Sequence, residues 1–184
     1  MNRATTKSTR QIKWLFAVLF CLLLSILVLT WLAGFRVNLT SSLPLGLYRL
    51  TDEAPQRRSS AFFCLESREF IELAQERNYV GPGHCPGGIK ALGKTIYGLP
   101  GDLVSIETNG AISINSQVIP GSAALPQDSR GRVMPAPQLQ AGIIPPDKAL
   151  MLSLHHKGSF DGRYFGLTSL AGLQPIQPVL VFNN

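Results

Sequence analysis

Metal-binding residues are scarce in this sequence. Its 184 residues include three cysteines and three histidines, and no two cysteines have the Cys-x-x-Cys spacing. A structural zinc site needs four ligands held close together, and His84 beside Cys85 supplies too few. We therefore expect no metal site.

Acidic residues are absent before position 52, and the chain has no internal repeat. Four basic residues precede a long apolar segment, and the rest of the chain contains 13 basic and 11 acidic residues. The net charge of +6 therefore lies mostly in an N-terminal tail that contains Arg3, Lys7, Arg10 and Lys13. A tail of this kind does not predict a nucleic-acid-binding surface, so we expect no nucleic-acid partner.

Residues 14–34 form an uncharged apolar segment of 21 residues. A helix of this length spans roughly the 30 Å hydrocarbon core of a bilayer. Trp14 and Trp31 lie near its two ends, where aromatic side chains prefer the membrane interface. A cleavable signal peptide is the alternative, but its apolar region is shorter, about 7–15 residues, and ends in a small-x-small site. The segment therefore favours an uncleaved transmembrane helix.

The basic tail also predicts the topology, because basic residues beside a span stay in the cytoplasm. We expect residues 1–13 to be a cytoplasmic tail and residues 35–184 to be a periplasmic domain. Cys64 and Cys85 fall in this domain, where an oxidising compartment allows a disulfide, whereas Cys21 lies within the span.

Residues 35–184 have the size of one domain, and their pattern is mainly that of antiparallel β-strands. The clearest signal is a hairpin in which Asn109-Gly110 separates two alternating runs. One helix is expected over residues 67–77. Residues 120–147 contain six prolines and are predicted to be a surface excursion without a core element. Short strands are expected at residues 47–50, 61–65, 89–97, 103–107, 111–114, 117–119, 149–154 and 179–182.

Two adjacent hydroxyl groups stand shortly after the apolar segment, on Ser41 and Ser42. Pro44 and Gly46 follow them and indicate a loop. A hydroxyl on such a loop can be a nucleophile, and it can equally serve turn formation, because Ser and Thr side chains hydrogen-bond their own backbone in turns.

Two further segments make the nucleophile a specific hypothesis. Lys94 lies inside an apolar strand, although most lysines lie on a solvated face. Later in the chain, Asp161 and Arg163 follow Ser159 at spacings of two. In an extended segment residues two apart point to the same side, so this acid and this base are expected to pair.

Together these segments resemble the type I signal peptidases, a family of membrane-bound Ser–Lys proteases. Lys94 stands four residues before a Gly-x-Pro-Gly-Asp motif, and residues 159–166 read Ser-x-Asp-x-Arg-Tyr-aromatic-Gly. The serine segment, Ser-x-Pro-x-Gly-x-Tyr, is similar to the conjugative-transfer (TraF-type) branch of that family. The segment from Cys64 to a Cys-Pro-Gly-Gly sequence at Cys85 is similar to that branch as well.

The resemblance implies a fold and a set of roles. The fold is a mainly β, antiparallel-sheet, signal-peptidase-like catalytic domain with one N-terminal transmembrane helix. Ser42 is the implied nucleophile, although its spacing to Pro44 leaves Ser41 as an alternative. Lys94 is the general base, which must be neutral, so burial has to lower its pKa from about 10.4. This chemistry needs no cofactor. The oxyanion donors would be the Thr40 hydroxyl and the backbone N–H of Ser42, with Ser159 orienting the lysine and Asp161 and Arg163 bracing the loop.

The implied function is that of a serine endopeptidase of the bacterial inner membrane, which removes leader segments from exported precursor proteins. The branch further implies a pilin-like substrate and partners in a conjugation or type IV secretion apparatus. Three alternatives stand beside this prediction: a housekeeping type I signal peptidase, an inactive periplasmic scaffold, and a Ser–His–Asp triad that would use His84, His155 or His156.

Overall fold

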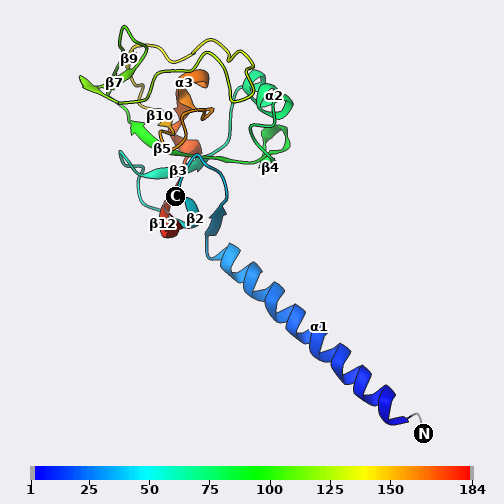
Figure 1. The fold of residues 1–184 in the computed structure, drawn as a ribbon. Coiled ribbons are helices and arrows are strands. Elements are labelled where there is room, and N and C mark those ends of the chain that lie inside the picture. Colours follow the sequence, from blue (N-terminus) through cyan, green and yellow to red (C-terminus); the bar gives the residue numbers. More distant parts are fainter. Residues whose placement is uncertain (1–2, 183–184) are drawn as a thin grey trace. The chain divides into compact units, whose positions relative to one another are not determined.

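The computed structural model of the chain describes residues 3–182, with side chains from residue 11 onward. It divides into two compact units, residues 1–36 and residues 37–184, and each is described by itself (Figure 1).

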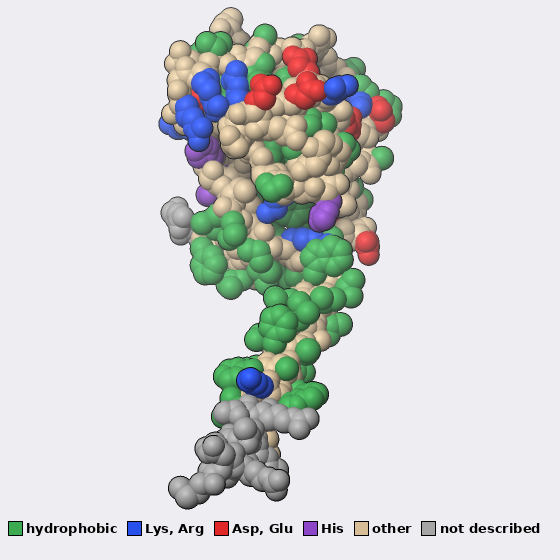
Figure 2. Space-filling model, turned by 90° about the vertical axis from the view of Figure 1, so that its right-hand side faces the viewer, with side chains coloured by type: hydrophobic (Ala, Val, Ile, Leu, Met, Phe, Trp, Pro, Cys, Tyr) green, Lys and Arg blue, Asp and Glu red, His purple; other side chains and the backbone are tan. Residues whose placement is uncertain are grey.

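The first unit is dominated by one long helix, α1 (Arg3–Leu32). Its segment Gln11–Leu32 has a mean hydropathy of 2.8 and is long and apolar enough to cross a membrane. The apolar side chains of this segment are exposed, as a lipid-facing helix requires, and they appear green in Figure 2. The expected membrane-spanning helix is thus present as a candidate by length and composition. It ends two residues earlier than expected, where Gly34 takes a positive φ of 86°.

The second unit consists mainly of antiparallel β-structure, as expected. Its larger sheet has seven strands in the order β1 (Phe35–Asn38), β2 (Leu45–Leu50), β12 (Gln174–Phe182), β3 (Ser60–Phe63), β5 (Leu92–Gly98), β10 (Lys148–Leu152) and β11 (Thr168–Ser169). A smaller sheet has four strands in the order β8 (Gln117–Val118), β7 (Ile112–Ile114), β6 (Leu103–Ile106) and β9 (Gly142–Ile143). The hairpin predicted at Asn109-Gly110 is β6–β7, with Val104 opposite Ile114.

Short elements connect these strands. The predicted helix over 67–77 is α2 (Arg68–Glu76), which buries Phe70, Ile71 and Ala74 on one face. It is followed by β4 (Pro82–Cys85) and by the 3₁₀ turn η1 (Pro86–Gly88). The remaining short elements are α3 (Gly162–Phe165) and η2 (Leu170–Gly172).

The last strand, β12, is longer than predicted. It begins at Gln174 rather than at residue 179, and it pairs with both β2 and β3. The first part of this strand was not predicted from the sequence because it contains prolines at 175 and 178, and proline cannot donate a hydrogen bond to a β-ladder. The register with β2 shifts between Pro178 and Leu180, so a bulge accommodates the second proline.

The excursion at residues 120–147 was predicted wrongly to lack core elements. Met134, Leu139 and Ile144 are buried, and β9 within it pairs with β6. The apolar residues of this segment come singly or in short groups between prolines and polar residues, so no periodic pattern marks a core element in the sequence. The excursion is also joined to the segment after α2, because the Tyr79 hydroxyl donates a hydrogen bond of 2.7 Å to Asp128.

A disulfide joins Cys64, just after β3, to Cys85 at the end of β4, with a Cα–Cα distance of 5.5 Å. It closes a loop that contains α2. Because the cysteines are 21 positions apart, the disulfide restricts the unfolded chain. We expect the double substitution Cys64→Ser, Cys85→Ser to lower the free energy of unfolding by about 3 kcal/mol, measured by urea denaturation.

Cys21, a free cysteine in α1, offers the control for this measurement. Cys21→Ser should leave the unfolding of the second unit unchanged. Rapid alkylation of both Cys64 and Cys85 in the native protein without reductant would contradict the prediction.

Candidate active site

Ser42 lies in the loop between β1 and β2, and buried neighbours hold this loop in place. Leu43 is 2% exposed and packs with Tyr48 and Ile176 in a small apolar cluster. The Tyr48 hydroxyl donates a hydrogen bond of 2.8 Å to the carbonyl of Pro44. Gly46 has a φ of 155°, and a Cβ there would come within 2.1 Å of the Leu180 carbonyl oxygen. Only glycine therefore allows β2 to approach β12 this closely beneath the loop.

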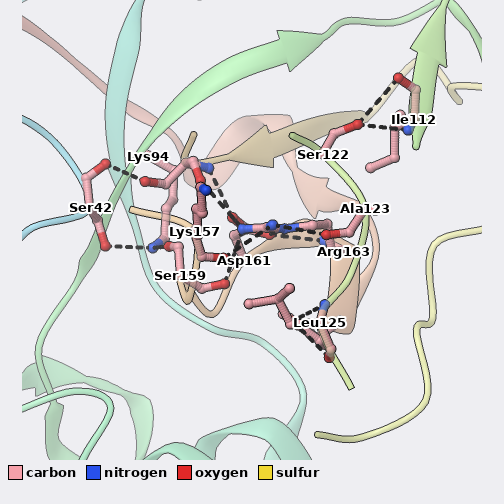
Figure 3. A network of polar contacts seen from close by, with 12 residues as sticks. Ser42, Lys94, Ile112, Ser122, Ala123, Leu125, Lys157, Ser159, Asp161 and Arg163 are labelled. Carbon is pink, nitrogen blue, oxygen red and sulfur yellow. Dashed lines mark hydrogen bonds and ion pairs between the residues drawn. The ribbon is translucent and has the colours of Figure 1, made fainter. Parts of the chain in front are cut away.

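Lys94 lies in β5, opposite Ala61 of β3, and is 3% exposed. Its Nζ donates hydrogen bonds to Ser42 Oγ at 2.8 Å and to Ser159 Oγ at 2.5 Å (Figure 3). The next residue toward the N-terminus is Gly93, where a Cβ would lie 3.0 Å from the Leu43 side chain. The strand and the serine loop thus pack closely enough for the amine to reach the hydroxyl.

The environment of Lys94 favours a neutral amine. Burial lowers the pKa of Lys94 from 10.5 to about 8, because desolvation penalises the ammonium form. The nearby carboxylate of Asp161 raises this pKa and the guanidinium of Arg163 lowers it, both by smaller amounts. With this pKa roughly a tenth of the amine is neutral at pH 7 and able to accept a proton, a far larger fraction than in an exposed lysine.

Asp161 and Arg163 form a buried ion pair behind Ser159. They are 0% and 2% exposed, and two bonds of 2.8 Å join Arg163 Nε and Nη2 to the two carboxylate oxygens of Asp161. Nη2 also donates to the carbonyl of Ser159 at 3.2 Å. The expected pair is present, but the expected extended segment is wrong. Asp161 instead caps the helical turn α3, accepting a hydrogen bond from the backbone N–H of Arg163, and the cap brings the two side chains together.

The two possible oxyanion donors differ in their present contacts. Thr40 is exposed, and its hydroxyl donates a 2.7 Å hydrogen bond to Asn38 Oδ1. The backbone N–H of Ser42 has no hydrogen-bond acceptor among residues 3–182. Ser41, the alternative nucleophile, is exposed, and in that part of the chain Lys94 hydrogen-bonds to Ser42 rather than to Ser41.

Asn38 is a residue that the sequence analysis missed. It is 5% exposed, and its Nδ2 donates to the carbonyls of Thr40, Leu43 and Pro44 at 3.0–3.1 Å. Its Oδ1 accepts from the backbone N–H of Thr40 as well as from the hydroxyl. One amide side chain therefore closes the serine loop on itself. An asparagine ahead of a Ser/Thr cluster is a possible signal for such a turn.

Removing this amide should loosen the loop. Asn38→Ala removes the side-chain partner of the Thr40 and Leu43 carbonyls and of the Thr40 N–H, while the Pro44 carbonyl keeps its bond from Tyr48. We therefore expect the free energy of unfolding to fall by about 1–3 kcal/mol. Asn38→Asp keeps the acceptor for Thr40 but turns a carboxylate oxygen toward the three carbonyls, and it should destabilise at least as much. Thermal denaturation measures both effects, and an unchanged melting temperature in both variants would contradict this role.

A cleft of about 220 Å³ opens over Ser42 and Lys94. The serine loop, β5 and residues 156–160 form three of its sides, and Tyr79-Val80-Gly81, from the loop that the disulfide closes, forms another. His156 lines this cleft, but no histidine hydrogen-bonds to Ser42 in the described residues. Those residues also contain no group of three or more His, Cys, Asp or Glu side chains that could hold a metal ion.

Known proteins resemble this chain over most of its length. The family described as signal peptidase, peptidase S26, matches residues 9–174. A plasmid transfer protein TraF of Escherichia coli is 32% identical over 151 residues, which cover 82% of this chain and 84% of that protein. A conjugal transfer protein TraF of Agrobacterium tumefaciens (strain 15955) is 36% identical over 155 residues, which cover 82% and 84%. The crystal structure of a signal peptidase I from Enterococcus faecalis V583 aligns with a TM-score of 0.39 and 18% identity, over 69% of this chain and 99% of that one.

Proposed function

Given that this chain belongs to the signal peptidase family, peptidase S26, we propose that it is a membrane-anchored serine endopeptidase with Ser42 as nucleophile and Lys94 as general base. The observation that carries the proposal is the 2.8 Å contact between Lys94 Nζ and Ser42 Oγ, made by a lysine that is 3% exposed. Serine is a weak nucleophile without a base, and burial gives this lysine the neutral form that a base requires.

The reaction runs in two halves. Ser42 Oγ attacks the scissile carbonyl carbon while the neutral Lys94 amine takes the hydroxyl proton, and a tetrahedral intermediate forms. The ammonium then gives this proton to the leaving amine as the C–N bond breaks, which leaves an ester on Ser42. Water attacks the ester carbonyl while Lys94 takes a proton from the water. The ammonium then returns this proton to Ser42 Oγ as the C–O bond to Ser42 breaks, which releases the carboxylic acid and restores both Ser42 and the neutral lysine.

The negative oxygen of the intermediate needs hydrogen-bond donors. The free N–H of Ser42 is one, and the Thr40 hydroxyl is the other once it turns from Asn38 Oδ1 toward the cleft. Ser159 holds the lysine amine at 2.5 Å, and the Asp161–Arg163 pair braces the loop that carries Ser159.

The substrate we propose is an exported precursor, and specifically a pilin-like subunit of a conjugative apparatus. The relatives named plasmid transfer and conjugal transfer proteins support this assignment. We assign residues 1–13 to the cytoplasm, residues 14–34 to the inner membrane and residues 35–184 to the periplasm. The basic tail, the apolar helix and the disulfide all favour that orientation. Components of a conjugation or type IV secretion apparatus are the proposed partners.

The proposal is tested by following the pilin precursor of a conjugative apparatus, expressed in the same cells as this protein. Mass spectrometry of the pilin termini should show cleavage in cells that carry the wild-type chain and an intact precursor in cells that carry Ser42→Ala. The purified full chain in detergent should also form a covalent adduct with a fluorophore-tagged penem, an acylating β-lactam, at Ser42. An unmodified wild-type protein together with an unprocessed precursor would refute a peptidase function.

The pH dependence follows from the pKa of Lys94, which burial lowers to about 8. Below this pH the amine is protonated and cannot act as a base, so the rate should rise about tenfold per pH unit and level off above pH 8. The rate of penem labelling between pH 5 and pH 10 measures this profile. Circular dichroism at each pH is the control for unfolding, and a rate independent of pH between 6 and 8 would contradict Lys94 as base.

A further inference from the structure

One buried hydroxyl near the site has no part in the mechanism above. Ser153 follows β10 directly and is 1% exposed. Its Oγ donates a 2.5 Å hydrogen bond to the backbone carbonyl of Ser42. A second hydrogen bond reaches Ser42 at its side chain, from Lys94, as Figure 3 shows. The nucleophile is therefore held at its main chain as well as at its side chain.

The backbone of Ser153 is itself fixed by the buried ion pair. Its N–H donates to Asp161 Oδ2 at 2.9 Å, and its carbonyl accepts from Arg163 Nη2 at 3.3 Å. Gly162, the first residue of α3, allows α3 to lie close to β10. A Cβ at this position would lie 2.7 Å from the Met151 carbonyl oxygen of β10. Ser153 thus transmits the position of α3 to the serine loop.

The serine loop depends on such side-chain contacts. Ser42 lies outside every strand, and Asn38 binds the carbonyls of Thr40, Leu43 and Pro44. Asn38 does not bind the carbonyl of Ser42, which accepts a hydrogen bond from Ser153 instead. The Ser153 hydroxyl is therefore the contact that ties the main chain of the nucleophile to β10.

We propose that Ser153 is a positioning residue, which fixes the main chain of Ser42 so that the hydroxyl faces the Lys94 amine. The proposal rests on the proposed peptidase function. Its physical basis is a closed circuit of hydrogen bonds. Arg163 Nη2 binds the carbonyls of both Ser153 and Ser159; Ser153 holds the nucleophile and Ser159 holds the base. One ion pair thereby sets the separation of the two reacting groups.

The circuit predicts a specific kinetic defect. A nucleophile displaced by about 1 Å reacts up to about 10²-fold more slowly. In Ser153→Ala we expect the maximal rate of penem labelling to fall by roughly 10- to 100-fold. The half-saturating penem concentration should stay within about twofold, because the cleft walls are unchanged. The midpoint of the pH profile should also stay in place, because Ser153 is not among the groups that shift the pKa of Lys94.

Ser122→Ala is the matched control. Ser122 is likewise a fully buried serine, and its hydroxyl bonds to the backbone of Ile112 and Ile119 around the smaller sheet. Removing this hydroxyl should lower the melting temperature while leaving the labelling rate as in the wild type. The comparison separates loss of a buried hydrogen bond from loss of nucleophile position.

The outcomes are distinct. A lower maximal rate in Ser153→Ala, with an unmoved pH midpoint and an unaffected Ser122→Ala, supports the proposal. A wild-type rate in Ser153→Ala overturns it, and so does a loss that comes from a shifted pH midpoint or from weaker penem binding. In each of those cases the proposed peptidase function is still supported, provided that the penem labels the wild-type protein. A wild-type protein that is never labelled overturns the peptidase function and this proposal together.

Discussion

Replacing Ser42 with alanine is expected to abolish precursor processing, and replacing Lys94 is expected to do the same. Loss of a nucleophile or its base in a serine peptidase lowers kcat by roughly 10⁴- to 10⁶-fold. The two side chains contact each other at 2.8 Å, so the double variant should be no worse than either single variant. Pilin termini in cells and penem labelling of the purified chain measure both losses.

Ser41→Ala is the control for the nucleophile, because Ser41 is the exposed neighbour. It should retain most of the activity. A processed pilin in Ser42→Ala cells beside an unprocessed one in Ser41→Ala cells would move the nucleophile by one residue. Full activity in Lys94→Ala would contradict the mechanism.

For the lysine, Lys94→Met separates catalysis from stability. The folded state lowers the pKa of this amine from 10.5 to about 8, so folding at neutral pH costs roughly 3 kcal/mol that a thioether does not incur. The sign follows from proton binding: the unfolded chain binds the proton more tightly, so the cost is full below pH 8 and vanishes above pH 10.5. Lys94→Met should therefore be inactive and more stable at pH 7, by up to about 3 kcal/mol.

The second large effect concerns the buried pair of Asp161 and Arg163. Asp161→Ala leaves the Arg163 guanidinium, which is 2% exposed, without its counter-charge. Breaking a buried pair in this way costs about 3–5 kcal/mol, and we expect a fall of that size in the free energy of unfolding. Urea denaturation measures it, and activity should fall with stability because Ser153 and Ser159 lose their shared support.

An exposed pair supplies the control. Arg68 and Glu72 of α2 form an ion pair of 2.7 Å, with side chains that are 91% and 54% exposed. Glu72→Ala should cost less than about 1 kcal/mol. Replacing both buried partners, as Asp161→Leu with Arg163→Met, should recover part of the lost stability without recovering activity. A change below 1 kcal/mol in Asp161→Ala would show that the pair does not brace the fold.

Parts of this molecule were predictable because they are encoded locally. Alternating apolar residues and the Asn109-Gly110 turn predict the β6–β7 hairpin. A lysine inside the apolar strand β5 marks the position of the buried amine. The motif at residues 159–166 predicts the pairing of Asp161 and Arg163, although it predicted an extended segment where α3 forms.

Other parts were not predictable because they depend on distant contacts. Ser153 binds the backbone carbonyl of Ser42, a residue 111 positions earlier, and such a bond follows no sequence period. The disulfide loop and the excursion at 120–147 meet through Tyr79 and Asp128, which are 49 residues apart. Their proximity exists only once the sheets have packed.

The position of β12 determines when the site can form during synthesis of the chain. This strand lies between β2 and β3, with Leu180 opposite Leu47. Until residues 174–182 have been made, β2 has no partner on that side, and the cluster of Leu43, Tyr48 and Ile176 beneath Ser42 lacks a member. Pairing across about 130 residues is slow, since the entropy of closing a long loop is lost before the contacts form. A nascent chain therefore carries Ser42 long before it carries the strand that supports the loop of Ser42.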